Sequence, residues 1–168
     1  GSEVSALLPI FAETITRLTA SHPNLRIILP AAPGVADTVA NAARNWPGAP
    51  VILDARHTSD TEKRAAFGAA DTALAASGTV SLELAAAATP MVIGYAPSRL
   101  TWEIMRRLVK VDTVTLVNRV SESRTVPEHL GPDCTPEALA TSIDALLKQG
   151  PAREAQLAAM TLTMERLG

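Results

Sequence analysis

Hydrophobic residues near the start of the chain recur at helical spacing. From Val4 they occupy positions i, i+3, i+4, i+7, i+11 and i+14, which predicts a helix that ends near 22–23. Short apolar runs rich in β-branched residues then alternate with helical stretches of about 10 to 15 residues. Thr135 and Pro136 are a typical cap and first residue of one of these helices. We expect strands at 25–29, 51–53, 72–75, 91–95 and 114–117, and helices at 35–45, 60–69, 79–88, 98–110, 135–148 and 151–166.

Strands that alternate with helices are typical of βαβ units, which form a parallel sheet with helices on both faces. The sequence therefore predicts an α/β fold, a Rossmann-like doubly wound parallel sheet, in a single domain over residues 1–168. A doubly wound domain normally begins with a strand that becomes central in its sheet. Because this chain begins with a helix, we expect the sheet to lack its first strand. Ligands of such folds bind beyond the carboxyl ends of the strands, so a site is expected in the loops that follow them.

The composition and the net charge of the chain exclude several classes of protein. With 168 residues, 47% of them hydrophobic, the chain can bury a core without disulfides or a structural metal. No apolar run approaches the ~20 residues of a membrane-spanning helix, and a net charge of -2 does not suit a protein that binds nucleic acid through its phosphates. The one cysteine, Cys134, excludes an internal disulfide and favours a reducing compartment, the cytoplasm. We expect neither a metal ion nor another cofactor.

The most informative stretch runs from Ala75 to Glu83. An apolar strand leads there into Ser77, Gly78 and Thr79, and then into an alanine-rich helix. Gly78 lets a ligand approach the backbone, the two hydroxyls can donate hydrogen bonds, and the start of the helix favours an anion. Glu83 follows Thr79 by four residues, which places both side chains on one face about 6 Å apart along the axis. This spacing suits the phosphate and the ribose of one nucleotide, because a carboxylate can bind ribose hydroxyls.

The same residues also fit an ordinary helix start. Ser77 or Thr79 would then cap the helix, and Glu83 would be a solvated acid in its first turn. On spacing alone we favour this second interpretation. The chain also lacks the G-x-G-x-x-G and G-x-x-x-x-G-K-[ST] motifs, so neither an ordinary dehydrogenase nor an NTPase is indicated.

A set of segments in a fixed order extends over nearly the whole chain and matches a known family. The segments are 3–4, 7–9 and 11, then 74–79 with 82–83, then 90–95, and further on 100–102, 107–110, 116, 118, 126–128 and 133–137. The S-G-T-x-x-L-E piece at 77–83 is shared by several sugar-nucleotide enzymes, whereas the ordered set is specific. The chain resembles lipid-A-disaccharide synthase, in particular the C-terminal, donor-binding half of this two-domain GT-B glycosyltransferase.

The resemblance implies transfer of 2,3-diacylglucosamine from its UDP-linked donor to 2,3-diacylglucosamine 1-phosphate, with inversion at the anomeric carbon and release of UDP, in lipid A biosynthesis. The family's N-terminal, acceptor-binding half supplies the general base, and this half is the partner that the chain requires. We therefore expect no catalytic residue, and no activity, in this chain alone. The residues implied at the donor site are Ser77, Gly78 and Thr79 at the diphosphate, Glu83 at the uridine ribose, and Asn118 and Glu128 at the remaining polar positions.

Three departures from the family's pattern accompany the resemblance. The family has a strand and a Gly-Ser-Arg phosphate loop before the position of Glu3, glutamine at the position of Gly131, and leucine at that of Arg119. Two alternatives stay open. Another UDP-sugar enzyme of the GT-B type, similar to UDP-N-acetylglucosamine epimerase, shares the 77–83 piece. The second alternative is a non-catalytic nucleotide-binding or interaction domain that has the same scaffold but has lost its partner half.

The helix expected at 98–110 has two apolar stripes. We expect one stripe to be buried, which consists of Leu100, Ile104, Leu108 and Val111. The second stripe would then face another surface, and it consists of Trp102, Met105 and Val109. The basic side chains beside it would attract an acidic lipid head group or bilayer surface, or would form a solvated face beside the missing half or a second subunit of a homo-oligomer. The acylated substrates of the resembled family favour peripheral contact with the inner face of the cytoplasmic membrane. The residues expected at this contact are Trp102, Arg106, Arg107 and Lys110.

Overall fold

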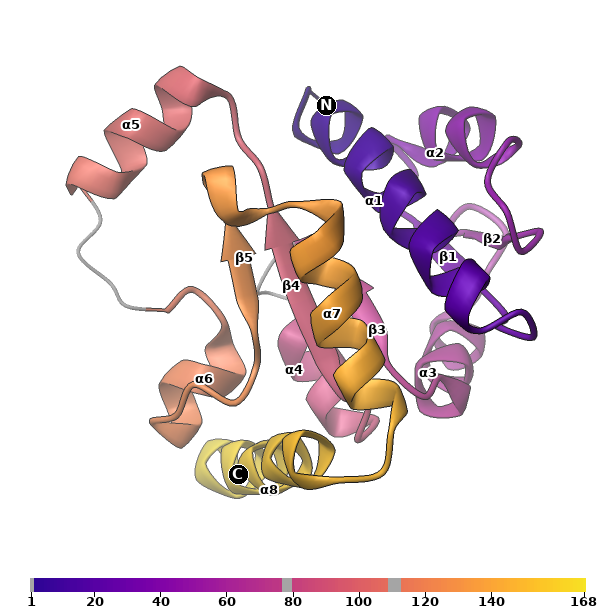
Figure 1. Ribbon diagram of the computed structural model, residues 1–168. Helices are drawn as coiled ribbons and strands as arrows, with labels where there is room; N and C mark the ends of the chain where they lie inside the picture. The colour runs from indigo at the N-terminus through magenta and orange to yellow at the C-terminus, as the bar shows by residue number, and fades with distance from the viewer. Residues whose placement is uncertain (1, 77–79, 109–112) are drawn as a thin grey trace.

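The computed structural model describes residues 2–76, 80–108 and 113–168. Helices and strands alternate along most of the chain (Figure 1). The described strands are β1 (Ile28–Ala31), β2 (Val51–Asp54), β3 (Ala73–Ala75), β4 (Met91–Tyr95) and β5 (Glu128–Leu130). The described helices are α1 (Ser2–Ser21), α2 (Ala36–Ala43), α3 (Asp60–Ala69), α4 (Ser81–Ala86), α5 (Arg99–Leu108), α6 (Leu116–Ser121), α7 (Pro136–Leu147) and α8 (Pro151–Leu167), with a short 3-10 helix at Gly131–Asp133.

Every pairing between described strands is parallel. β1 pairs with β2, and β3, β4 and β5 form a second group with β4 in the middle. The predicted α/β class with parallel strands is therefore confirmed. The sheet is nevertheless in two pieces, since no ladder joins β1 to β3 among the described residues.

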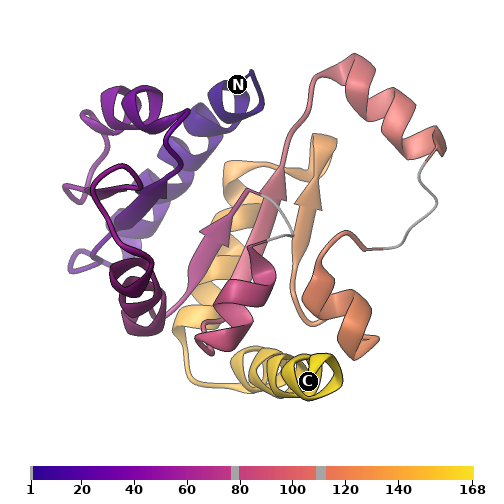
Figure 2. The same cartoon turned by 180° about the vertical axis from the view of Figure 1, so that it is seen from behind.

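Helices cover the group of β3, β4 and β5 on both faces (Figures 1 and 2). On one face Val92 shares a core cluster with Leu139 of α7 and with residues of α1. On the other face Met91 and Ile93 share a cluster with Val117 of α6 and with residues of α4 and α8. Consecutive β4 side chains point to opposite faces, so Met91, Val92 and Ile93, each without exposed surface, fill both layers.

A buried amide fixes α8 to the start of β4. The side chain of Gln156 accepts a hydrogen bond from the Met91 N–H (2.9 Å) and donates one to the Met91 carbonyl (2.7 Å). The ladder to β5 begins only at Ile93, which is in register with Glu128. Gln156 therefore supplies the partners that the Met91 backbone does not find in a neighbouring strand.

The first strand differs from its predicted bounds. The apolar run at 25–29 predicts a strand that Pro30 closes, whereas β1 continues through Pro30. At its end the carbonyl of Ala31 accepts a hydrogen bond from the N–H of Ala55 (3.0 Å) after β2. Backbone groups alternate in direction along a strand, so those of Pro30 face away from β2. The missing N–H of proline therefore removes no hydrogen bond from this ladder.

The strand predicted at 114–117 is wrong. Helix α6 begins at Leu116, inside that segment, and the place beside β4 is taken by β5, which the sequence pattern did not predict. The carboxylate of Glu128 accepts hydrogen bonds from the N–H groups of Val114 and Thr115, which a strand would use for its ladder. Val117 lies on α6 and is buried against β4. Packing of this side chain and capping by Glu128 override the β-propensity of the segment.

The remaining predicted strands and helices are confirmed, with bounds that differ by about two residues at most from the observed ones. The start of α7 also agrees, because the Thr135 side chain accepts a hydrogen bond from the N–H of Ala138 and Pro136 is the first helical residue. Within the described ranges, no helix is both long and apolar enough to span a bilayer.

Candidate functional site

The carboxyl ends of the strands are the edge at which a parallel sheet of this type binds ligands. β3 ends at Ala75 on this edge, and α4 follows it on the face that Figure 2 shows. Ser77, Gly78 and Thr79 lie between these two elements and are outside the described residues. Their contact with a diphosphate therefore stays a prediction.

Glu83, the residue predicted to hold a ribose, lies on α4 in an ion pair. Its carboxylate is 2.8 Å from Nζ of Lys63 on α3. The same ammonium lies 5.8 Å from the centre of the Phe67 ring, within the range of a cation–π contact. Glu83 and Lys63 are both partly exposed, so their pair stabilises the fold by about 1 kcal/mol at most. A ligand hydroxyl can replace this contact at little cost.

Glu128 forms a hydrogen-bonded unit with the turn that precedes α6. Its carboxylate accepts hydrogen bonds from the Thr113 hydroxyl, from the N–H of Val114 and from the N–H of Thr115, the last at 2.7 Å. Free N–H groups and the helix dipole both favour a carboxylate at such a position. Glu128 thus ties the edge strand β5 to the start of α6.

Asn118 is buried in the same unit. Its side-chain carbonyl accepts a hydrogen bond from the Val126 N–H (3.0 Å), and its amide donates to the Val126 carbonyl (2.9 Å) and the Thr113 hydroxyl (3.2 Å). Both amide hydrogens are therefore engaged within the fold. The structure brings Asn118 and Glu128 together through Thr113, whereas Glu83 is bound to α3. Between these two groups no hydrogen bond is formed by residues that the structure describes.

The two apolar stripes of α5 face opposite to expectation. Leu100 and Leu108 are 73% and 77% exposed, and Ile104 is 49% exposed. Trp102 is half-buried instead and lies against Gly131, where a side-chain carbon would come within 2.5 Å of the indole ring. The predicted burial of the Leu100 stripe is therefore wrong for its described members, and Val109 and Val111 lie outside the described residues. The surface open to a partner is this stripe and not the one around Trp102.

Gly131 has a structural reason to be glycine. Its φ is +57°, in the left-handed region that side chains disfavour, and the Trp102 ring occupies the space of a side chain. The glutamine that the resemblance implies here would displace the indole. Gly131 and Trp102 therefore form a matched pair that holds α5 to the end of β5.

Two basic side chains of α5 lie beside the same acid. The guanidinium of Arg106 lies 2.7 Å from the carboxylate of Glu103, and that of Arg107 lies 3.7 Å from it. The hydrogen bond from Arg106 holds the pKa of Glu103 below its usual value. Figure 1 shows α5 standing away from the sheet. The two arginine side chains and the Leu100 stripe on this helix are all exposed. Lys110, predicted at the same contact, lies outside the described residues.

Two residues of these units were not identified from the sequence. Lys63 lies on α3, which begins with a capping box in which Ser59 and Glu62 bind each other's backbone N–H groups. The S-x-x-E pattern is visible in the sequence and would have fixed the start of this helix. Thr113 has no such signal, because its role depends on Glu128, which follows it by 15 residues.

Other polar groups near the strand ends are engaged with each other. The side chain of Arg56 hydrogen-bonds the Asp54 carboxylate and lowers the pKa of this acid to about 2, and Arg56 also binds Asp37 (2.8 Å). Cys134 is buried, and burial raises the pKa of its thiol, which does not suit a nucleophile. In the described parts of the chain, no three His, Cys, Asp or Glu side chains are grouped to hold a metal ion.

Comparison with known proteins gives a consistent family. Residues 1–167 match a family model described as lipid-A-disaccharide synthetase. The lipid-A-disaccharide synthase of Ruegeria pomeroyi is 56% identical over 170 residues, and that of Rhodospirillum centenum is 42% identical over 167 residues, each covering 99% of this chain. The protein of the same name from Nitrobacter winogradskyi is 39% identical over 158 residues, or 94% of this chain. The matches take up 42%, 41% and 39% of the relatives, so the chain spans about two fifths of the length of the curated relatives it matches.

Proposed function

The chain belongs to the lipid-A-disaccharide synthetase family, and on this basis we propose that it is the donor-nucleotide-binding part of a glycosyltransferase of lipid A biosynthesis. The family match over residues 1–167 carries the proposal. It also sets aside the epimerase-like alternative. The chain is about two fifths as long as its relatives, so the activity is assigned to the longer protein. The proposed reaction transfers 2,3-diacylglucosamine from its UDP-linked donor to 2,3-diacylglucosamine 1-phosphate and releases UDP.

In this reaction the bond between the anomeric carbon and the UDP oxygen breaks, and a hydroxyl of the acceptor bonds to the opposite side of that carbon. Negative charge grows on the departing diphosphate, where fixed N–H groups and hydroxyls stabilise it. We assign this role to Ser77, Gly78 and Thr79. The base that takes the proton of the acceptor hydroxyl would come from the part of the longer protein outside residues 1–168.

The remaining polar residues receive different roles. We assign Glu83 to the hydroxyls of the uridine ribose, which would take the place of Lys63 at its carboxylate. Asn118 and Glu128 are assigned an indirect role at the donor site, because their side chains are engaged in holding the turn around Thr113. The support for this difference is that the Glu83 side chain is exposed, whereas Asn118 is fully buried.

Calorimetric titration of UDP into the full-length protein tests the assignment, with UMP and ADP as comparison ligands. We expect saturable UDP binding that weakens at least about tenfold in the Glu83→Ala variant, because hydrogen bonds to a charged group are lost. Glu13→Ala is the matched control. It removes another exposed carboxylate from an ion pair, 3.3 Å from Arg17 on α1, and should leave UDP affinity unchanged.

Two results would contradict this proposal. The nucleotide assignment fails if the folded protein does not bind UDP, or if Glu83→Ala binds it as tightly as the unmodified protein. The catalytic assignment fails if UDP binds normally but is never released from the acylated donor in the presence of acceptor. That second result would favour the non-catalytic nucleotide-binding alternative.

We also propose that α5 makes a peripheral contact with the inner face of the cytoplasmic membrane. The support is the exposed stripe of Leu100, Ile104 and Leu108, which lies on the same helix as the exposed cations of Arg106 and Arg107. Apolar side chains flanked by arginines suit a bilayer surface that contains anionic lipids. The acylated substrates proposed above would reach the protein from such a surface.

Co-sedimentation of the full-length protein with vesicles tests this contact. Binding to vesicles that contain phosphatidylglycerol should fall when Leu100 and Leu108 are both replaced by asparagine, and vesicles of phosphatidylcholine alone should bind less. Val51→Asn, at another apolar side chain that is 58% exposed, serves as the control. Unchanged vesicle binding in the double variant would contradict the proposal. A dimer that is lost in the double variant, without vesicle binding by the unmodified protein, would assign the stripe to a homo-oligomer.

A further inference from the structure

Aromatic residues make up only 3% of the chain, and two of them lie near the carboxyl ends of β4 and β5. Tyr95 is the last residue of β4, in register with Leu130 at the end of β5. Trp102 lies on α5, and Figures 1 and 2 both show this helix beyond the tips of the two strands. A parallel sheet binds ligands at this edge, and aromatic side chains commonly line ligand sites.

The indole of Trp102 occupies the space that a side chain at residue 131 would fill. A side-chain carbon on Gly131 would lie 2.5 Å from Cε2, 2.6 Å from Cδ2 and 3.0 Å from Cε3 of the indole. These three atoms belong to the six-membered ring, so the indole lies directly against the backbone at the end of β5. Trp102 is half-buried, which leaves part of the ring exposed beside this strand end.

The end of β5 differs chemically from the family's pattern. The pattern has glutamine at the position of Gly131, and a glutamine would offer an amide that donates and accepts hydrogen bonds. Gly131 has no side chain, and the ring of Trp102 covers its place. An indole presents mainly apolar surface. This chain is therefore apolar at a point of the ligand edge where the pattern is polar.

We infer that Trp102 is a specificity-determining residue, whose exposed ring surface contacts an acyl chain of the UDP-linked donor. The inference rests on the proposed function, which assigns the uridine ribose to Glu83 on α4. Because α4 leads from β3 to β4, a nucleotide bound there leaves the ends of β4 and β5 for the acylated sugar. An acyl chain buries apolar surface against the ring, and a half-buried ring suits one narrow chain better than a broad protein surface.

The second role proposed for α5 supports this direction of the donor. The exposed stripe of Leu100, Ile104 and Leu108 is proposed to contact the bilayer. Trp102 follows Leu100 by two residues, and helical residues two apart do not face the same side. One side of α5 would thus contact the bilayer and another side the donor. An acyl chain that leaves the bilayer beside this helix would meet Trp102 first.

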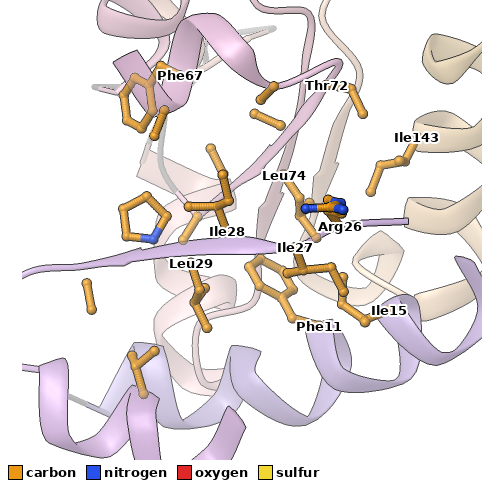
Figure 3. A pocket seen from close by; sticks show the side chains of 18 of the residues that line it. Phe11, Ile15, Arg26, Ile27, Ile28, Leu29, Phe67, Thr72, Leu74 and Ile143 are labelled. Atoms are coloured by element: carbon orange, nitrogen blue, oxygen red, sulfur yellow. The ribbon is translucent and has the colours of Figure 1, made fainter. Parts of the chain in front are cut away.

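A second apolar surface in the described structure is less suitable for an acyl chain. It lines a cavity of about 860 Å³ between β1 and β3, and Figure 3 shows Phe11 and Phe67 on opposite sides of β1 there. Among the described residues, β1 and β3 have no partner strand on the edges that line this cavity. An acyl chain would leave the N–H and C=O groups of these edges without hydrogen-bond partners. We therefore assign the acyl chain to Trp102.

Fluorine NMR of the full-length protein labelled with 5-fluorotryptophan tests the inference. The Trp102 resonance is assigned by its absence in the Trp102→Phe variant. The two ligands are UDP-2,3-diacylglucosamine and UDP-N-acetylglucosamine, which has the same nucleotide but no long acyl chain. We expect the acylated donor to shift the Trp102 resonance and UDP-N-acetylglucosamine to leave it in place.

Steady-state kinetics supply a second readout. Trp102→Ala should raise the KM for the acylated donor at least about tenfold with kcat unchanged, because a contact made equally in the ground state and the transition state is lost. Trp102→Phe should retain most of the contact, and UDP affinity should be the same in both variants. Trp46→Phe, at a buried tryptophan elsewhere in the chain, is the control and should leave this KM unchanged.

Three results would overturn the inference. They are binding of the acylated donor without a shift of the Trp102 resonance, an equal shift with UDP-N-acetylglucosamine, and an unchanged KM in Trp102→Ala. In each of these cases UDP still binds and depends on Glu83, so the proposed function stands. If the folded protein does not bind UDP, the proposed function itself fails, and this inference fails with it.

Discussion

The strand groups around β4 and around β1 have similar apolar sequences but different environments. Met91, Val92 and Ile93 have no exposed surface, whereas Ile28 and Val51 are 43% and 58% exposed. β4 has a strand on each edge and helices on each face, whereas among the described strands β1 has a partner, β2, on one edge alone. Burial of a strand is thus set by its neighbours on edges and faces, and not by its own hydrophobicity.

The strongest contrast should be seen between two matched substitutions. Ile93→Ala should lower the free energy of unfolding by about 4 kcal/mol, because it leaves a cavity in a closed core, whereas Ile28→Ala should cost less than about 1 kcal/mol. Urea denaturation followed by circular dichroism measures both. Equal losses of unfolding free energy in the two variants would contradict the difference described between β4 and β1. A larger loss for Ile28→Ala in the full-length protein than in this chain would sharpen it, because a part of the protein outside residues 1–168 would then bury Ile28.

The next effect concerns the amide that completes the start of β4. Gln156→Leu should destabilise the fold by about 3 kcal/mol, because it leaves the N–H and the carbonyl of Met91 buried without partners. Thr161→Leu, an exposed polar residue on the same helix, is the control and should change stability little. If the two variants unfold at the same urea concentration, Gln156 does not have the anchoring role described for it.

A third substitution tests how far the packed region extends toward α5. Gly131→Ala should cost about 2 kcal/mol, since its φ is +57° and the new carbon would meet the Trp102 ring. Tryptophan fluorescence should shift to longer wavelength as the indole becomes exposed. Gly34→Ala, where no atom lies within 4 Å of the added carbon, is the control. Unchanged fluorescence and stability in Gly131→Ala would show that α5 is not held by this contact.

The smallest effect is a pH dependence at the contact between α1 and α7. His22 lies 2.7 Å from the carboxylate of Asp144, and hydrogen bonds from His22 and then Lys148 hold the pKa of Asp144 below its usual value. Because the folded pKa is lowered, this stabilisation is present above pH of about 4 and is lost as the pH falls through the folded pKa. Both groups are partly exposed, so the contribution is under about 1 kcal/mol.

Thermal unfolding between pH 2 and pH 6 measures this contribution. Asp144→Asn should unfold at a slightly lower temperature than the unmodified protein at pH 6, and the two should converge toward pH 2. Asp60→Asn, at an exposed acid in the first turn of α3, gives the background for removing a carboxylate. A difference between Asp144→Asn and the unmodified protein that stays constant over this range would exclude the linkage.

Much of the fold could be predicted from the sequence because its signals are local. The alternation of strands and helices indicated an α/β fold with parallel strands, and Thr135 with Pro136 marked the start of α7. The bounds of β4 were predicted correctly because its apolar run is buried on both faces. The ordered set of matching segments likewise pointed to the family that the comparison later identified.

The candidate site was only partly predictable, because its contacts join distant parts of the chain. Glu83 was identified as a polar residue near a strand end, but its pairing with Lys63 depends on how α3 packs beside α4. Asn118 and Glu128 were linked by the family pattern alone. Their common partner, Thr113, follows from a turn that replaced the predicted strand at 114–117.

The sequence by itself determined most of the strands and helices, that the strands are parallel, and which family the chain belongs to. Periodicity and caps depend on residues that are close in the sequence, and the order of the motifs can be read along the chain without its three-dimensional structure. Only the tertiary structure decided which stripe of α5 is exposed, and that β5 and not 114–117 borders β4. Each of these depends on whether another element occupies an adjacent face or edge, and no local pattern specifies that.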